Sequence, residues 1–236
     1  MCRRGAQVLL VARSEDKLEA LVRELGDSAA AYPCDASDHR AVAVMAERVQ
    51  AEHGVPDVVV NSAGAGRWLR IEDTDPEEFL AMAAVPYFAA FFITRAFVEG
   101  MLARGSGWVV NVDSPASQIA WPGAVGYISA RGALRGFDAG LRADLRRSGI
   151  GVTHVVPAKV SSEYFLHNPG SEERIPTIAR LIPTLTPEQV AEAICRAVES
   201  GRREVVVPSM LRAFYWSGRF MPRLTEWLAW RTGARR

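Results

Sequence analysis

The feature that most constrains this chain is the regular alternation of short apolar runs with longer segments of helical period. The apolar runs lie at 7–12, 29–33, 57–61, 107–112, 151–156 and 204–208. The segments of helical period lie at about 15–25, 38–53, 76–103, 124–148 and 187–200. Strands that are apolar throughout are buried on both faces, so the alternation predicts an α/β fold with a doubly wound parallel sheet covered by helices on both sides.

Composition agrees with one domain over residues 1–236. A chain of 236 residues with 49% hydrophobic content can bury one sizeable core without needing a second domain. Its formal net charge is +1, so the chain as a whole exerts little attraction on nucleic acid. We therefore expect no nucleic-acid partner.

Cysteine usage and the first residues indicate a cytoplasmic protein. Cys2, Cys34 and Cys195 are far apart and have no CxxC spacing, which argues against a disulfide framework and against a metal site. The apolar run in MCRRGAQVLLVARS is too short for a signal peptide, and no uninterrupted apolar run reaches the roughly 18 residues of a membrane-spanning helix. We expect a soluble chain that is at most attached to a membrane surface.

A possible catalytic pair lies in GYISARGAL at 126–134. Tyr127 and Arg131 are four residues apart in a predicted helix, so their side chains share one face. A fixed positive charge beside a phenol stabilises the phenolate and so favours proton donation. The pattern also fits a surface tyrosine with an arginine neighbour.

Four segments together resemble the short-chain dehydrogenase/reductase family. They are VVVNSAGAG at 58–66, NVDS at 111–114, YISAR at 127–131 and VVPAKVSS at 155–162, and they occur in the order and at the spacing of that family. Ser114 lies thirteen residues before Tyr127, as the catalytic serine of the family does. The resemblance extends over nearly the whole chain and implies a Rossmann-like fold.

The resemblance implies catalytic roles for three residues. Tyr127 would donate a proton to a substrate carbonyl, Ser114 would position the carbonyl oxygen, and Arg131 would take the place of the family's lysine. An arginine keeps the charge but hardly ever releases a proton, so it could hold a ribose and could not serve a proton relay. Pro86 stands where the family has a relay asparagine, and it predicts a bend near Met82 to Pro86.

Asp113 and Lys159 lie beside these motifs without a family role. The Asp113 carboxylate could oppose a bound hydride acceptor or cap the end of its strand. Lys159 could supply a cation near a nicotinamide or be an ordinary solvated lysine.

The resemblance also implies a nicotinamide nucleotide, and NADP(H) rather than NAD(H). The strand at 7–12 is followed by Arg13, which could hold a 2′-phosphate, whereas members that bind NAD(H) usually have an acid there. The other cofactor-binding residues that the resemblance implies, besides Tyr127 and Arg131, are Asp35, Asn61, Ala63, Gly64, Pro157, Val160 and Ser162. Arg13 could instead be a solvated turn residue, and Asp35 a helix cap.

One part of the family pattern is missing. The family begins with a strand and a TGxxxGxG turn, and this sequence begins where the second strand would follow. The missing strand is central in the family's sheet, so its two neighbours must pair with each other, or the sequence as given is shorter than the functional protein. We favour a misassigned translation start.

Two further segments bear on the substrate and on partners. Residues 158–186 have no clear element and resemble a substrate lid, with Phe165, Ile175, Ile178, Leu181 and Ile182 as its apolar residues. Residues 209–236 form an aromatic and basic extension, in which Leu224, Trp227 and Leu228 share a helical face. The extension could pack on the domain, cover a lipid-like substrate, contact a membrane or join subunits.

Two functions remain open. The first is an oxidoreductase that interconverts a carbonyl and a secondary alcohol on an apolar small molecule. The second is a binding or scaffold protein with the same fold and no redox turnover. In either case the resemblance implies a homodimer or homotetramer formed through the helices at 76–103 and 124–148.

Overall fold

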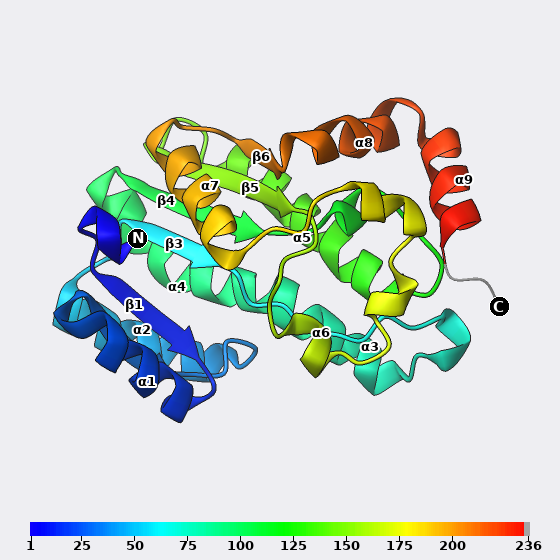
Figure 1. Cartoon of the computed structure of the whole chain (residues 1–236). Helices are drawn as coiled ribbons and strands as arrows, with labels where there is room; N and C mark the ends of the chain where they lie inside the picture. Colours follow the sequence, from blue (N-terminus) through cyan, green and yellow to red (C-terminus); the bar gives the residue numbers. More distant parts are fainter. Residues whose placement is uncertain (234–236) are drawn as a thin grey trace.

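The computed structural model describes residues 1–233, in which parallel strands are flanked by helices on both faces (Figure 1). The strands are β1 (Val8–Ala12), β2 (Ala29–Pro33), β3 (Val58–Asn61), β4 (Gly107–Val112), β5 (Ile150–Pro157) and β6 (Glu204–Val207). The helices are α1 (Glu15–Leu25), α2 (His39–His53), α3 (Pro76–Ala83), α4 (Ala89–Arg104), α5 (Val125–Asp144), α6 (Tyr164–His167), α7 (Pro187–Glu199), α8 (Ser209–Phe220) and α9 (Pro222–Thr232). The α/β fold that the alternation predicts is confirmed.

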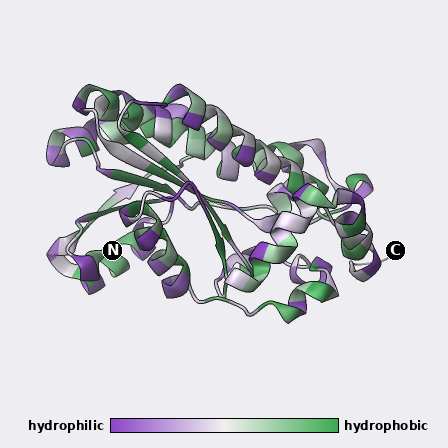
Figure 2. Cartoon of the chain, turned by 90° about the horizontal axis from the view of Figure 1, so that it is seen from above, coloured by the Kyte–Doolittle hydropathy of each residue, from purple (hydrophilic) through white to green (hydrophobic). Residues whose placement is uncertain are grey.

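The two faces of the larger sheet pack against different helices because neighbouring residues on a strand point in opposite directions. Val59 and Val152 belong to a buried cluster with residues of α2 and α4. Val110 and Val155 belong to a second cluster with Val190 of α7. Figure 2, coloured by hydropathy, shows the strands as the most continuously apolar part of the chain between these layers.

The strands form two separate parallel sheets. One has the order β1-β2 and the other the order β3-β4-β5-β6. The inner edges of β1 and β3 do not pair with each other. The expectation that the two neighbours of the missing strand pair directly is therefore wrong. A cavity of about 1030 Å³ lies between them, and residues of β1, β3, α2, α4 and α7 line it. We call this cavity the inter-sheet slot.

The bend expected near Pro86 is a π-helical turn. Ala84–Phe88 forms this turn between α3 and α4, and Pro86 is buried within it. Proline cannot donate the backbone hydrogen bond of a regular helix, and a π turn is one of the usual ways to accommodate such an interruption. The stretch Pro76–Arg104 is long and apolar enough to cross a membrane, judged by length and composition alone. Core helices of soluble proteins meet the same two criteria, so this is weak evidence.

Segment 158–186 is more ordered than its sequence indicates. It contains α6 and two 3-10 turns, η6 (Glu172–Arg174) and η7 (Thr177–Leu181). The helix start expected at Thr186 is confirmed, because the Thr186 hydroxyl accepts a hydrogen bond from the Gln189 backbone and the Gln189 side chain accepts one from the Thr186 backbone.

The C-terminal extension forms α8 and α9, and its residues 234–236 lie outside the described part of the chain. On α9 the buried residues are Thr225 and Ala229, whereas Leu224 and Trp227 are 48% and 54% exposed. Packing onto the domain therefore does not account for Leu224 and Trp227. The exposed large apolar side chains of the two helices are Met210, Trp216, Phe220, Leu224, Trp227 and Trp230, and Met221 lies exposed between them.

Candidate active site

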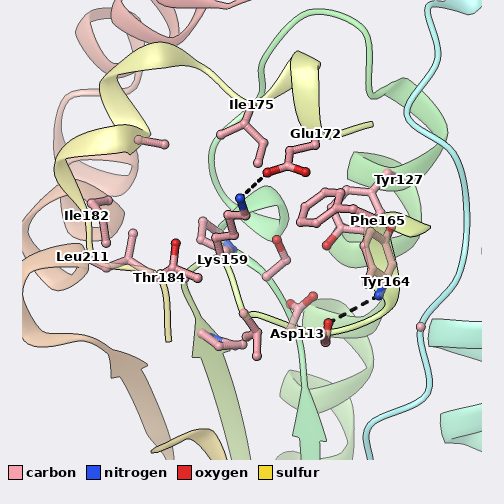
Figure 3. Close-up of a pocket in the computed structure, with 18 of the residues that line it drawn as sticks. Asp113, Tyr127, Lys159, Tyr164, Phe165, Glu172, Ile175, Ile182, Thr184 and Leu211 are labelled. Atoms are coloured by element: carbon pink, nitrogen blue, oxygen red, sulfur yellow. Dashed lines mark hydrogen bonds and ion pairs between the residues drawn. The ribbon is translucent and has the colours of Figure 1, made fainter. Parts of the chain in front are cut away.

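A cavity of about 900 Å³ lies at the carboxyl ends of β3, β4 and β5 (Figure 3). In open parallel sheets this edge is where ligands bind. Segment 158–186 contributes much of the lining, including Tyr164, Phe165, Ile175, Ile178 and Ile182, and α8 adds Leu211 and Phe214. Leu181 is 74% exposed and does not line the cavity, which corrects its place in the expected apolar lid.

Tyr127 lies in the wall of this cavity, near the start of α5. Its ring centroid is 5.0 Å from that of Trp68 and 6.3 Å from that of Tyr164, and the residue is 7% exposed. These rings and Phe165 belong to one apolar cluster. Tyr127 is therefore held by packing on a rigid helix, and the alternative of a surface tyrosine is wrong.

Ser114 lies on the same cavity, directly after β4. It is the N-cap of a short 3-10 turn, η5 (Pro115–Ser117), and its Oγ accepts a hydrogen bond of 3.2 Å from the Ala116 backbone. This bond uses one lone pair of the hydroxyl, so the proton and the second lone pair remain for a ligand.

Arg131 lies one helical turn after Tyr127 and is 5% exposed. Its Nη1 donates a 3.0 Å hydrogen bond to the Val112 carbonyl, and its guanidinium carbon lies 5.1 Å from the centroid of the Tyr127 ring. A Cβ at Gly64 would come within 2.5 Å of Arg131 Nη2, so glycine leaves the room that this guanidinium occupies. The fixed cation that the sequence predicts beside the phenol is present, and the surface-arginine alternative is wrong.

Asp113 lies behind Ser114 and faces two basic groups. Its Oδ1 is 3.9 Å from Arg131 Nη1 and its Oδ2 is 3.2 Å from His154 Nε2, with the Asp113 side chain completely buried. Burial raises the pKa of Asp113 to about 6, although His154 and Arg131 act in the opposite direction. The carboxylate thus belongs to a buried charged cluster rather than to a solvated strand end.

The residues expected at the adenosine end lie at the ends of β1, β2 and β3. Arg13 follows β1 and is exposed, and it lies close enough to Asp35 to help lower the pKa of that carboxyl, which hydrogen bonds from Ser37 lower most. Asp35 does not cap a helix, because Asp38 is the N-cap of α2. Ala63 and Gly64 line the inter-sheet slot.

Asn61 also lines this slot, but its amide is already engaged. Its Nδ2 donates to Asn111 Oδ1 at 2.7 Å and to Thr94 Oγ1 at 3.1 Å. This network ties the end of β3 to β4 and α4, which gives Asn61 a structural role besides the expected one.

The residues expected at the nicotinamide end, Pro157, Val160 and Ser162, line the 900 Å³ cavity after β5. Lys159 between them forms an ion pair with Glu172 across this cavity and lies 5.6 Å from the Phe165 ring centroid (Figure 3). Lys159 is exposed, and its charge is paired with that of Glu172 in segment 158–186.

The structure adds residues that the sequence did not single out. Tyr164 donates a hydrogen bond of 2.9 Å to the Gly66 carbonyl and accepts one of 3.3 Å from Trp68 Nε1, and burial raises its pKa. It is therefore a bonded wall residue beside Tyr127. His154 and Asp138 were also missed, although a histidine within a buried apolar strand is a visible signal.

One buried donor in this region is free to meet a polar ligand such as the ribose of a nicotinamide nucleotide. Arg131 Nε is buried without a hydrogen-bond partner among the described residues, and it lies beside Gly64 at the edge where the two cavities adjoin. For the diphosphate, residues 1–236 contain no TGxxxGxG turn, the anion-binding element that the resemblance leads one to expect.

Comparison with known proteins identifies the family of this chain. The model of the short chain dehydrogenase family matches residues 1–169. "Probable oxidoreductase EphD" of Mycobacterium tuberculosis is 33% identical over 236 aligned residues, which cover 94% of this chain and 40% of that protein. The chain thus spans well under two thirds of this relative. The "NADP-dependent 3-hydroxy acid dehydrogenase YdfG" of Salmonella typhi is 29% identical over 195 aligned residues. The alignment covers 80% of this chain and 78% of that protein.

Solved structures give the same assignment. A short-chain dehydrogenase from Streptomyces avermitilis has a TM-score of 0.81 and 27% identity, covering 96% of this chain and 89% of its own. An alcohol dehydrogenase from Thermococcus sibiricus, complexed with 5-hydroxy-NADP, has a TM-score of 0.75 and 25% identity, covering 87% of this chain and 86% of its own. The fold, the matched family model and the cavity at the strand ends lead to one conclusion: this chain belongs to the short-chain dehydrogenase family of oxidoreductases.

Proposed function

We propose that the protein is an NADP(H)-dependent oxidoreductase that interconverts a carbonyl and a secondary alcohol on an apolar small molecule. The observation that carries this proposal is the meeting of Tyr127, Ser114 and Arg131 on one cavity at the carboxyl ends of the strands. A phenol, a hydroxyl and a buried cation are the groups that a carbonyl reduction requires from the protein.

In the proposed reaction, the nucleotide supplies or accepts the hydride when it is bound. Tyr127 donates its proton to the carbonyl oxygen, and Ser114 holds that oxygen by a hydrogen bond. Arg131 stabilises the phenolate that remains and can hold ribose hydroxyls, but it keeps its own proton. The proton must therefore return to Tyr127 from solvent or from another group.

Preference for NADP(H) over NAD(H) rests on charge. Arg13 at the end of β1 is exposed and can meet a 2′-phosphate, and no acid stands at the end of that strand. The Salmonella relative and the Thermococcus structure carry NADP in their names, which agrees with this choice. The apolar lining of the cavity, with Phe165, Ile175 and Leu211, favours an apolar substrate.

We also propose that an extended strand fills the inter-sheet slot in the nucleotide-binding form. β1 and β3 run in the same direction as their partners and have unpaired inner edges, which a strand between them would satisfy. A glycine-rich turn after that strand would supply the diphosphate contacts. In this view the form that carries such a strand and turn is the one that binds the nucleotide.

The first prediction follows from this view. Residues 1–236 alone should bind NADP(H) weakly, with a dissociation constant at least about tenfold higher than that of a form extended by a strand and a TGxxxGxG turn. Isothermal titration calorimetry of both forms measures this. Micromolar or tighter binding by residues 1–236 would show that other residues replace the turn. A second experiment tests the proposed function itself. It measures carbonyl reduction by the extended form with apolar ketones and aldehydes. Nucleotide binding without turnover would favour the scaffold alternative.

Two apolar surfaces bear on partners. On α4 and the π turn before it, Phe88, Phe91 and Leu102 are each at least 40% exposed, which favours a homodimer or homotetramer through this face. The apolar residues of α8 and α9 lie among Arg212, Arg219 and Arg223, which favours peripheral contact of 209–236 with an anionic membrane. A charge on the α4 face should disrupt the oligomer, so we expect Phe91→Glu to lower the oligomeric state measured by light scattering. Trp227→Glu, on α9, should leave it unchanged.

A further inference from the structure

A buried group of charged side chains lies behind Arg131 and takes no part in the reaction described above. Asp113 follows β4, His154 lies in β5 and Asp138 lies on α5, and none of the three is more than 4% exposed. Ionisable groups so deeply buried are uncommon unless they are paired, and they often serve a functional site.

The contacts form a row that ends at the cavity. His154 Nδ1 hydrogen-bonds to Asp138 Oδ2, and the other Asp138 oxygen accepts from the Asn111 amide. His154 Nε2 lies 3.2 Å from Asp113, and the other Asp113 oxygen lies 3.9 Å from Arg131. Arg131 in turn lies over the Tyr127 ring.

The charges of this row balance only when all of its members are present. Two carboxylates face one guanidinium and one imidazole, so the group is neutral when the imidazole is protonated. A buried charge without compensation costs several kcal/mol, and therefore each member constrains the protonation of the next. Neither Asp113 oxygen has a partner in good hydrogen-bond geometry among the described residues, and the Ser117 hydroxyl is the uncharged polar group close enough to favour the ionised form.

We propose that Asp113 is a positioning residue that offsets the charge of Arg131 at Tyr127, and that His154, held by Asp138, keeps Asp113 ionised for this purpose. The proposal rests on the proposed function in that Tyr127 is the group whose proton is exchanged. Without Asp113, the full charge of Arg131 would act on the phenol, which would then ionise at a lower pH. With Asp113 ionised, more of the phenol keeps the proton that it must donate.

Several groups face Asp113 and set its ionisation. They are His154 from β5, Arg131 and Asp138 from α5, and Tyr215 from α8. Burial raises the pKa of Asp113 from 3.8 to about 6, so the folded state binds one more proton than the unfolded state between these values. Protonated Asp113 stabilises the folded state relative to ionised Asp113. This stabilisation is complete below pH 3.8 and is lost as the pH rises through about 6. At neutral pH the ionised Asp113 therefore costs stability where it lies.

The test measures the ionisation of Tyr127 directly. The chain has five tyrosines, which can be labelled with ¹³C at the ring carbon that carries the hydroxyl and titrated by NMR, with Tyr127→Phe identifying the signal. In Asp113→Asn we expect the midpoint of Tyr127 to fall by about one pH unit, the order of magnitude by which a nearby charge shifts a pKa. His154→Gln should leave this midpoint near that of the parent, because Asp113 titrates at about pH 6 and is ionised wherever a phenol titrates, at about pH 10. Its effect should appear instead as a shift of the Asp113 titration itself to higher pH. Asp144→Asn, an exposed acid at the end of the same helix, should leave the Tyr127 midpoint unchanged.

Unfolding measured against pH gives a second reading. Asp113→Asn should flatten the pH dependence of stability between about pH 4 and pH 6, because the titrating group is gone. An unchanged Tyr127 midpoint in a folded Asp113→Asn protein would overturn the proposal, and if that variant does not fold, the same result in Asp113→Ser would do so. His154→Gln should move the pH dependence of stability at about pH 6 to higher pH, and an unmoved dependence would overturn the role of His154. Neither measurement needs nucleotide or substrate. A shifted midpoint in a protein that reduces no carbonyl would therefore support the coupling while the proposed function fails.

Discussion

Replacing Tyr127 by phenylalanine should lower carbonyl reduction by roughly 10²–10⁴-fold, the range expected when a general acid is lost. The change removes one hydroxyl and keeps the ring, which packs against Trp68 and Tyr164. The change removes one polar interaction of the hydroxyl, with the Arg131 side chain, and opens no large cavity, so the free energy of unfolding should change by only about 1 kcal/mol. Steady-state kinetics with NADPH and a panel of apolar ketones and aldehydes measure the effect, on a form that binds the nucleotide.

Tyr164→Phe is the matched control, because this second tyrosine lines the same cavity and contacts the same Trp68 ring. It loses two hydrogen bonds and should lower stability more than Tyr127→Phe does, with a smaller effect on the chemical step. Ser114→Ala should fall between them, since it removes a positioning bond and leaves the proton donor. If Tyr127→Phe reduced carbonyls as fast as the parent, the oxidoreductase proposal would be wrong and the scaffold alternative would replace it.

Much of the fold could be predicted because buried parallel strands carry their signal in consecutive residues. The runs at 29–33 and 107–112 coincide with β2 and β4, and the helix expected at 15–25 coincides with α1. The capped start at Thr186 was equally clear, since a cap is a local feature of a few residues. Ser114, Tyr127 and Arg131 were predicted from their spacing and from the resemblance of their motifs to those of the family, and all three line one cavity, although their roles remain predictions.

The remainder depends on contacts between distant residues. The row from Asp138 through His154 to Asp113 joins α5, β5 and β4, and no local pattern relates these positions. Leu224 and Trp227 share a helical face, but the sequence does not say whether the domain or solvent lies beside that face. The short helices of segment 158–186 lack a sustained period because turns and prolines interrupt them, and they are held instead by contacts such as the bridge between Val160 and Leu185.

Replacing Arg131 by methionine should lower both turnover and nucleotide affinity, with about a 10²–10³-fold loss in kcat, the range expected when a fixed electrostatic stabiliser is removed. Methionine keeps an apolar stem of similar length in this buried position, so the lost charge is the main change. Arg131→Lys should retain or raise turnover, because lysine restores a positive charge and can also release a proton. Titration calorimetry and steady-state kinetics separate the two effects, since ribose contacts act on affinity and phenolate stabilisation acts on kcat.

The buried Asp113 complicates a single substitution, because Arg131→Met leaves this carboxylate without the guanidinium that lies 3.9 Å from it. The double variant Arg131→Met/Asp113→Asn removes both charges together and is the proper comparison. If the loss of activity comes from the missing cation at Tyr127, the double variant should stay as inactive as Arg131→Met while regaining stability. If it comes from an unbalanced charge that distorts the site, activity should return with stability, and Arg131 would then be a structural residue and not part of the catalytic pair.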